Sequence, residues 1–141
     1  MIRFRNFIFF ICLSGGLAWV CMGAAQNYLR QEKFMALQEI KKRWGDAPFS
    51  PNAFKTAAVN VRAKMAHDLI RRKALVGKSA SEIKALLGPT SGYFWSERVP
   101  TYFIEEGWSQ KKDSWQLVFL IDANERVTEV RVHRNCCEKG D

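Results

Sequence analysis

The chain has 141 residues, which is enough for one modest domain and a short appendage. Its formal net charge is +8, from 22 Lys and Arg against 14 Asp and Glu, which suits contact with anionic lipid head groups or acidic protein surfaces. The alternative is that this charge only keeps the protein soluble. Of its four cysteines, two lie in an apolar N-terminal stretch and two are adjacent near the C-terminus, which excludes a scaffold stapled by several disulfides.

The N-terminal segment has the layout of an export signal. Two arginines precede the uncharged run Phe7–Ala25, and Gly23, Ala24 and Ala25 close this run with the small residues typical of signal peptidase sites. The run is also just long enough to span a bilayer, so an uncleaved anchor is the alternative. We therefore assign residues 1–25 to a signal peptide or an N-terminal inner-membrane anchor, and we expect an extracytoplasmic, periplasmic location for the remainder.

Residues 26–50 are expected to form a basic helix followed by a loop linker. Apolar residues recur at helical spacing among basic ones up to Trp44, and Gly45 can end the helix. One interpretation is a helix that lies on lipid with Trp44 at the interface. The other interpretation, which we favour because the apolar stripe is short, is a solvated spacer or a helix packed on the following domain.

A second helix is predicted over residues 51–73. Ser50 and Pro51 are typical of an N-cap followed by the first helical residue. An apolar stripe then repeats every three or four residues, and a basic cluster at the end suits a helix C-terminus electrostatically. The stripe consists of Phe54, Ala58, Val61, Met65 and Leu69.

The segment 77–89 predicts a short helix with both ends specified locally. Ser79 can cap the N-terminus, and Glu82 stands three residues later, where it completes a capping box. Gly88 can take a left-handed conformation after the last turn, and Pro89 prevents continuation. This motif is the most specific pattern in the chain, and it consists of Gly77, Ser79, Glu82, Leu86, Leu87, Gly88 and Pro89.

After Pro89 the apolar pattern changes to the alternation of strands. The aromatic segments 93–95 and 102–104 indicate a strand with an irregular approach. Residues 114–122 alternate most clearly and are apolar on both faces, which predicts a central strand. A turn at 122–125 leads to the last strand, 126–134. In that strand we expect three residues to face inward (Thr128, Val130, Val132) and three outward (Glu129, Arg131, His133).

This order of elements resembles the SmpA/OmlA family, the BamE-like domains of bacterial envelope proteins. The resemblance covers about residues 62–134, roughly half of the chain. It rests on four groups of residues: Arg62, Met65, Asp68 and Leu69; Gly77-Lys78-Ser79 with Glu82-Ile83; Leu86-Leu87-Gly88-Pro89; and Leu117–Asp122 followed by Arg126-Val127.

The resemblance implies an α+β domain over residues 51–134, with two helices packed on one face of a three-stranded antiparallel sheet. The apolar helix and the basic helix would precede this domain. It also implies a non-catalytic role in envelope organisation, since the name-giving member is an accessory subunit of the outer-membrane β-barrel assembly machinery. The chain departs from that member because it lacks a lipobox, carries the extra helix at 26–44, and ends in a Cys-Cys tail.

Few residues suggest chemistry. The sequence shows no Ser-His-Asp order, Gly-rich phosphate loop or paired carboxylates, so we expect neither an enzyme nor a cofactor. Cys136 and Cys137, in the polar tail of residues 135–141, can form a vicinal or intermolecular disulfide in an oxidising compartment. They could offer a metal three ligands together with His133, but adjacent cysteines chelate poorly and structural zinc needs four ligands, so no metal site is expected.

The expected function is a non-enzymatic envelope protein that binds another protein or an anionic membrane surface, in outer-membrane protein assembly or envelope integrity. No nucleic-acid partner is expected, because the N-terminus directs export. The alternatives are an inhibitor-like module that binds an enzyme, and a redox protein that uses Cys136 and Cys137. Trp95, Trp108 and Trp115 lie near the strands; we expect Trp115 in the core and an exposed subset of aromatics in a partner-binding patch.

Overall fold

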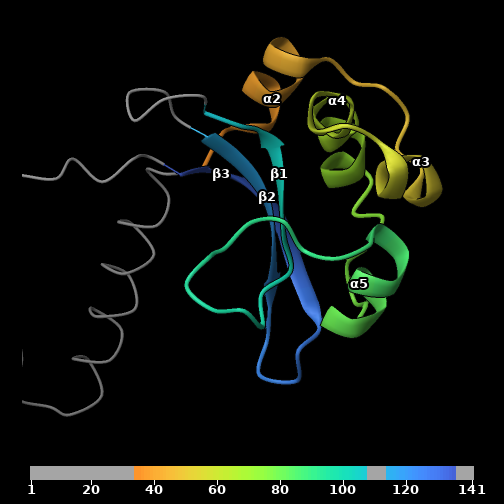
Figure 1. The fold of residues 1–141 in the computed structure, drawn as a ribbon, viewed down its shortest axis with the longest axis vertical. Coiled ribbons are helices and arrows are strands. Elements are labelled where there is room, and N and C mark those ends of the chain that lie inside the picture. Colours follow the sequence, from red (N-terminus) through yellow and green to blue (C-terminus); the bar gives the residue numbers. More distant parts are fainter. Residues whose placement is uncertain (1–33, 108–113, 136–141) are drawn as a thin grey trace, which may run out of the picture. The chain divides into compact units, whose positions relative to one another are not determined.

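A three-stranded antiparallel sheet with helices packed against one face forms the fold (Figure 1). A computed structural model describes residues 34–107 and 114–135, all within one compact unit that begins at Phe34. In chain order the elements are α2 (Leu37–Trp44), α3 (Pro51–Thr56), α4 (Val59–Arg71), α5 (Ala80–Leu87), β1 (Thr101–Glu105), β2 (Ser114–Ile121) and β3 (Val127–Asn135). Among the described helices, none is both long and apolar enough to cross a membrane.

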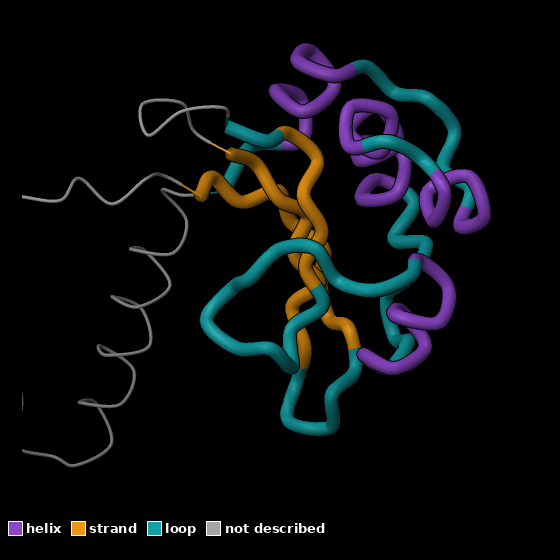
Figure 2. Tube along the Cα trace, viewed as in Figure 1, coloured by secondary structure: helices purple, strands orange, loops and turns teal. Residues whose placement is uncertain are grey.

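The sheet has the order β1-β2-β3, so β2 is the central strand, as its apolar character on both faces predicts. Leu117 and Phe119 of β2 lie in the core beneath the helices, together with Leu69 of α4 and Ile83 of α5. The opposite face is covered by the loop between α5 and β1, which crosses the strands on the side away from the helices (Figure 2). The α+β class, the antiparallel sheet and the packing of helices against it are therefore confirmed.

The single helix expected over residues 51–73 is wrong. Ala57 and Ala58 are extended, with ψ angles of 148° and 158°, and they separate α3 from α4. The Arg62 side chain explains how the break is accommodated, because it donates hydrogen bonds to the carbonyls of Phe54 and Lys55 at the end of α3. Consequently Ala58 and Val61 of the predicted apolar stripe are exposed, whereas the other three members are buried.

The helix expected over residues 26–44 begins later within the described chain. Residues 34–36 are extended instead, because Phe34 forms a bridge with His133 and the Met35 N–H donates to the Val132 carbonyl at 2.9 Å. Helix α2 starts at Leu37 and packs on α4. Ile40 of α2 and Phe49 of the following loop are buried in the core, so this segment is part of the packed unit.

A bulge in the last strand changes which residues face the core. The register shifts between Leu120, which pairs with Glu129, and Ile121, which pairs with Val127. Val127 is therefore buried and Thr128 is exposed, contrary to the strict alternation expected. His133 does lie on the face opposite the helices, but it is buried there rather than solvated.

Candidate functional site

The capped-helix motif is structural. Ser79 Oγ accepts from the Glu82 N–H at 3.2 Å and Glu82 Oε2 accepts from the Ser79 N–H at 2.7 Å, which confirms the capping box. That second bond is the main reason why the pKa of Glu82 is lowered. Gly88 ends α5 with a φ of +88°, and Pro89 follows it.

The remaining motif residues also serve the fold. The Gly77 N–H donates to the Val127 carbonyl at 2.7 Å, and Leu87 is fully buried while Leu86 packs partly against the core. The motif thus fixes α5 on the sheet. The two cysteines of the tail, Cys136 and Cys137, lie outside the described residues, as does Trp108.

The strongest candidate site is the loop between α5 and β1, residues 88–100, which we call the aromatic loop. Hydrogen bonds fasten it to the sheet: the Tyr102 hydroxyl donates to the Gly88 carbonyl, and Gln116 Nε2 donates to the Tyr93 carbonyl at 2.8 Å. Near its end, the Pro100 carbonyl accepts from the Phe119 N–H. The loop is therefore held in a defined position although it contains no regular secondary structure.

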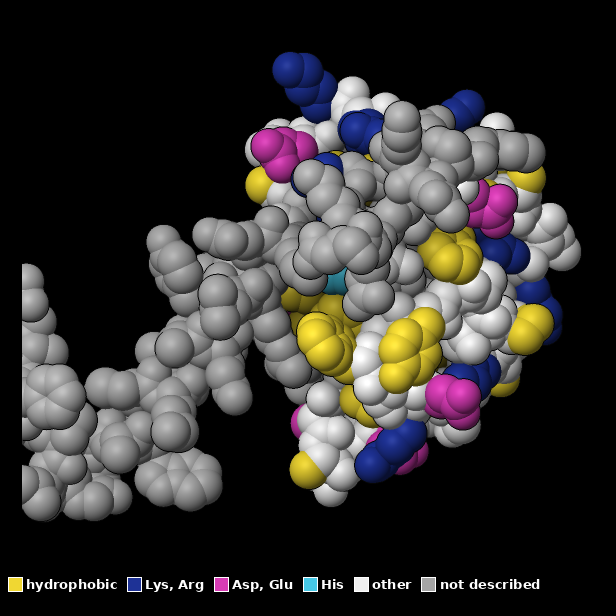
Figure 3. Space-filling model, turned by 60° about the vertical axis from the view of Figure 1, so that its left-hand side comes forward, with side chains coloured by type: hydrophobic (Ala, Val, Ile, Leu, Met, Phe, Trp, Pro, Cys, Tyr) yellow, Lys and Arg dark blue, Asp and Glu magenta, His cyan; other side chains and the backbone are white. Residues whose placement is uncertain are grey.

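Three consecutive aromatic residues divide the aromatic loop into an anchor and an exposed pair. Phe94 is buried, with its ring centroid 4.8 Å from that of His133 and 5.9 Å from that of Phe34. Tyr93 and Trp95, on either side of it, are 60% and 69% exposed. Figure 3 shows hydrophobic side chains gathered on this face of the molecule.

Trp95 is held in a strained conformation. Its φ is +57°, a left-handed value that is costly for a residue with a Cβ, and the Ser96 N–H donates to the Phe94 carbonyl at 2.7 Å around it. An N–H bonded two residues back around a central residue of positive φ is a γ-turn of the rare, strained kind. Strain of this kind persists only when surrounding contacts hold it, and it is concentrated at functional sites.

A second aromatic cluster joins α2 to the sheet. Glu105 accepts from Trp44 Nε1 at 2.8 Å and from Arg43 Nη2 at 2.7 Å. The Arg43 guanidinium lies over the rings of both Trp44 and Trp115, 5.2 Å and 5.3 Å from their centroids. Trp115 is thus half-buried against Trp44 rather than in the centre of the core. Because the polar groups of this cluster bond to one another, the cluster is best explained as a structural contact that holds α2 against the sheet.

Asp68 is a buried carboxylate near the end of α4. Its side chain accepts from the Phe49 N–H at 2.9 Å and pairs with Arg71 and Arg72. The bond from Phe49, followed by those from the two arginines, lowers the pKa of Asp68 to about 2. A carboxylate held ionised in this way fastens the loop after α2 onto α4; it is a poor proton donor.

Within residues 34–107 and 114–135, no group of three His, Cys, Asp or Glu side chains is arranged to hold a metal ion. His133 Nδ1 lies 3.2 Å from Gln116 Nε2, so this nitrogen contributes to a buried polar pair. Comparisons with protein-family models, curated proteins and solved structures found no match for the chain. The candidate site therefore rests on the geometry of the aromatic loop.

The sequence shows the aromatic segment 93–95, but its pattern predicts the approach to a strand. All three residues are aromatic, so the sequence does not predict that Phe94 is buried while its two neighbours are exposed. The hydrogen bond from the Phe49 N–H to Asp68 is not predicted either, because the two residues lie 19 apart in the chain. The left-handed conformation of Trp95 could not be predicted either, because this position holds neither glycine nor asparagine, the residues that usually mark such a conformation in a sequence.

Proposed function

We propose that this chain is a non-enzymatic binding protein of the bacterial cell envelope, and that the aromatic loop contacts a protein partner. The observation that carries the proposal is the exposure of Tyr93 and Trp95 on a loop whose backbone is strained and firmly anchored. Exposed Trp and Tyr side chains dominate the binding energy of protein interfaces. Anchoring reduces the entropy that such a loop loses when it binds.

The arrangement of elements supports a BamE-like domain as the scaffold. Helices α4 and α5 precede a β1-β2-β3 meander in chain order, as in the family that the sequence resembles. Under this proposal the apolar N-terminus directs export, either as a cleaved signal or as an anchor. The intact mass of the mature protein tests this part, since retention of Met1 and cleavage after Gly23 or Ala25 give different masses.

Site-specific photo-crosslinking in cells tests the role of the aromatic loop. A photoreactive phenylalanine analogue replaces Trp95 in the full chain, and the matched control carries it at Val61, an exposed apolar position on α4 that is 43% accessible. We expect a discrete crosslinked protein from position 95 and none from position 61. Equal products from both positions, or none from position 95, contradict the proposal.

The identity of the crosslinked protein then separates the specific roles. Subunits of a barrel-assembly machine support a role in outer-membrane protein assembly, whereas a single hydrolase or protease favours the inhibitor-like alternative. Binding of that protein to the purified Trp95→Gly variant provides the second measurement. We expect at least a tenfold loss of affinity, roughly what removal of a central aromatic side chain causes, while the fold is retained.

A further inference from the structure

The outer edge of β3 is paired at its two ends and open between them. Near the C-terminal end of the strand, the Met35 N–H donates to the Val132 carbonyl. Near the N-terminal end, the Gly77 N–H donates to the Val127 carbonyl and the Val127 N–H donates to the Lys78 carbonyl at 2.9 Å. No backbone bond from another described segment reaches the outer edge over residues 128–131.

The open stretch exists because both flanking segments turn away from the strand. After Met35 the chain leaves the edge of β3 and enters α2. The other flanking segment, which contains Gly77 and Lys78, reaches this edge only after Val76. N–H and C=O groups point to the same side at every second residue of a strand. Because the Val132 carbonyl faces the outer edge, the N–H and carbonyl of Val130 face it as well.

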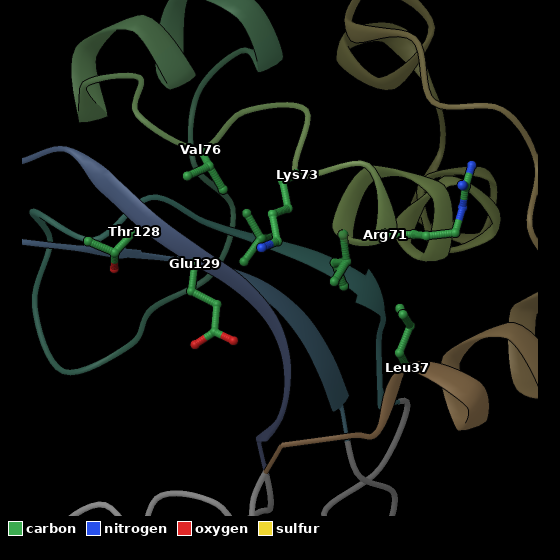
Figure 4. Close-up of a pocket in the computed structure, with 8 residues that line it drawn as sticks. Leu37, Arg71, Lys73, Val76, Thr128 and Glu129 are labelled. Carbon is green, nitrogen blue, oxygen red and sulfur yellow. The ribbon is translucent and has the colours of Figure 1, made fainter.

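A groove of about 470 Å³ lies along this open stretch. Its walls come from the start of α2, the end of α4 with the turn after it, and β3 (Figure 4). The apolar lining consists of Leu37, Ile70, Val76 and Val130. The groove therefore combines unpaired backbone with apolar walls, which is the combination that an added β-strand recognises.

Lys73 gives the groove its charge. It lies in the turn after α4 with a φ of +51°, a left-handed value that lysine rarely adopts, and its side chain reaches toward β3 (Figure 4). Its ammonium has no ion-pair or hydrogen-bond partner among the described residues. Arg71 points away from β3 (Figure 4), since its guanidinium pairs with Asp68. Glu129, at the groove margin, is paired with Arg131 at 2.7 Å.

We propose that an extended, acidic segment of a partner protein adds to β3 as a short fourth strand at residues 128–131, with a carboxylate on Lys73. Four residues of strand span about 13 Å, so the recognised segment is short. Alternate apolar side chains of that segment would fill the space between Leu37 and Val76. This site lies on the sheet edge and does not depend on the aromatic loop.

An acidic partner fits better than a second copy of this chain. Two copies of the edge would place Lys73 of each copy beside the basic residues of the other, which is unfavourable for a chain of net charge +8. A basic peptide would meet the same repulsion, whereas an acidic one gains a charge-assisted hydrogen bond.

The test uses the full chain in a mild detergent and an acetylated, amidated peptide of alternating Glu and Val residues. Amide NMR shifts are followed during titration, with the matched Lys and Val peptide as the control. We expect saturable shifts centred on the amides of Thr128–Arg131 with the acidic peptide, and binding at least tenfold weaker with the basic one. Equal responses, shifts centred elsewhere, or concentration-dependent shifts of these amides without peptide overturn the proposal.

Two variants sharpen the result. Lys73→Glu should weaken binding of the acidic peptide about tenfold, which corresponds to about 1.4 kcal/mol, and should reverse the preference for acidic over basic peptide. Lys64→Glu, the same charge change at an exposed position of α4 outside the groove, should leave both affinities unchanged. Val130→Pro removes the outward N–H and should abolish binding of either peptide. If both lysine variants weaken binding equally, the contact with Lys73 is refuted.

Discussion

Asp68 is predicted to stabilise the folded protein in a way that depends on pH. Its side chain is 10% exposed and is surrounded by three donors, the Phe49 N–H and the guanidinium groups of Arg71 and Arg72. These donors lower its pKa from the ordinary 3.8 to about 2. The difference corresponds to about 2 kcal/mol in the free energy of unfolding.

The sign follows from which state binds the proton more tightly. Because the folded pKa is lowered, the unfolded chain takes up a proton first as the pH falls. The contribution of Asp68 is therefore complete above pH 3.8 and is lost as the pH falls toward about 2. Replacing Asp68 with Asn removes the charge while an amide oxygen can still accept from Phe49, so the variant should lose this pH-dependent contribution.

Denaturant unfolding of both proteins, from neutral pH down to about pH 2, measures the effect. The Asp68→Asn variant should be less stable by about 2 kcal/mol at neutral pH, and the difference should shrink across the acidic window. Other carboxylates titrate in both proteins, so they cancel in the difference. Asp46→Asn, which breaks an exposed pair with Lys41, should cause a smaller loss. A difference that stays constant with pH would refute the assignment.

Three further predictions use the same unfolding assay. Ser79→Ala should cost about 1 kcal/mol through loss of the cap, and Gly88→Val should cost about 2 kcal/mol because a β-branched residue resists the positive φ; no change in either variant would contradict the placement of α5. Tyr102→Phe should cost about 1–2 kcal/mol because the buried Gly88 carbonyl loses its donor. Burial raises the pKa of Tyr102 to about 12, so the stability of the unaltered protein should fall as the pH rises above 10, and less so in this variant. Trp95→Gly should be more stable than Trp95→Ala by about 1 kcal/mol, since glycine adopts the left-handed φ without strain; equal stabilities would argue against the strained turn.

The parts of the fold that sequence predicts well are those whose causes are local. Helix α5 is specified by Ser79 and Glu82 at one end and by Gly88 at the other, all within ten residues. The central strand is specified by its own apolar alternation. In both cases the interactions that decide the structure lie within the segment that shows the pattern.

The errors arise where distant contacts override a local pattern. Residues 51–73 have helical periodicity throughout, yet two alanines are extended because Phe54 packs against Tyr102 and Arg62 satisfies the end of α3. Residues 34–36 are extended because Phe34 forms a β-bridge with His133 at the outer edge of β3. The aromatic loop is a further case in which a distant contact decides the structure. Trp95 is exposed because its neighbour Phe94 packs against His133 of β3.

The bond between Met35 and Val132 also limits the order in which the domain can form. The segment before α2 has no edge to pair with until nearly the whole described chain, including the last strand, has been synthesised. Contacts so far apart in sequence close slowly, because the intervening chain must be ordered first. The extended segment 34–36 can therefore join the sheet only after β3 is available, so a chain that stops short of β3 leaves this segment without its hydrogen-bond partner.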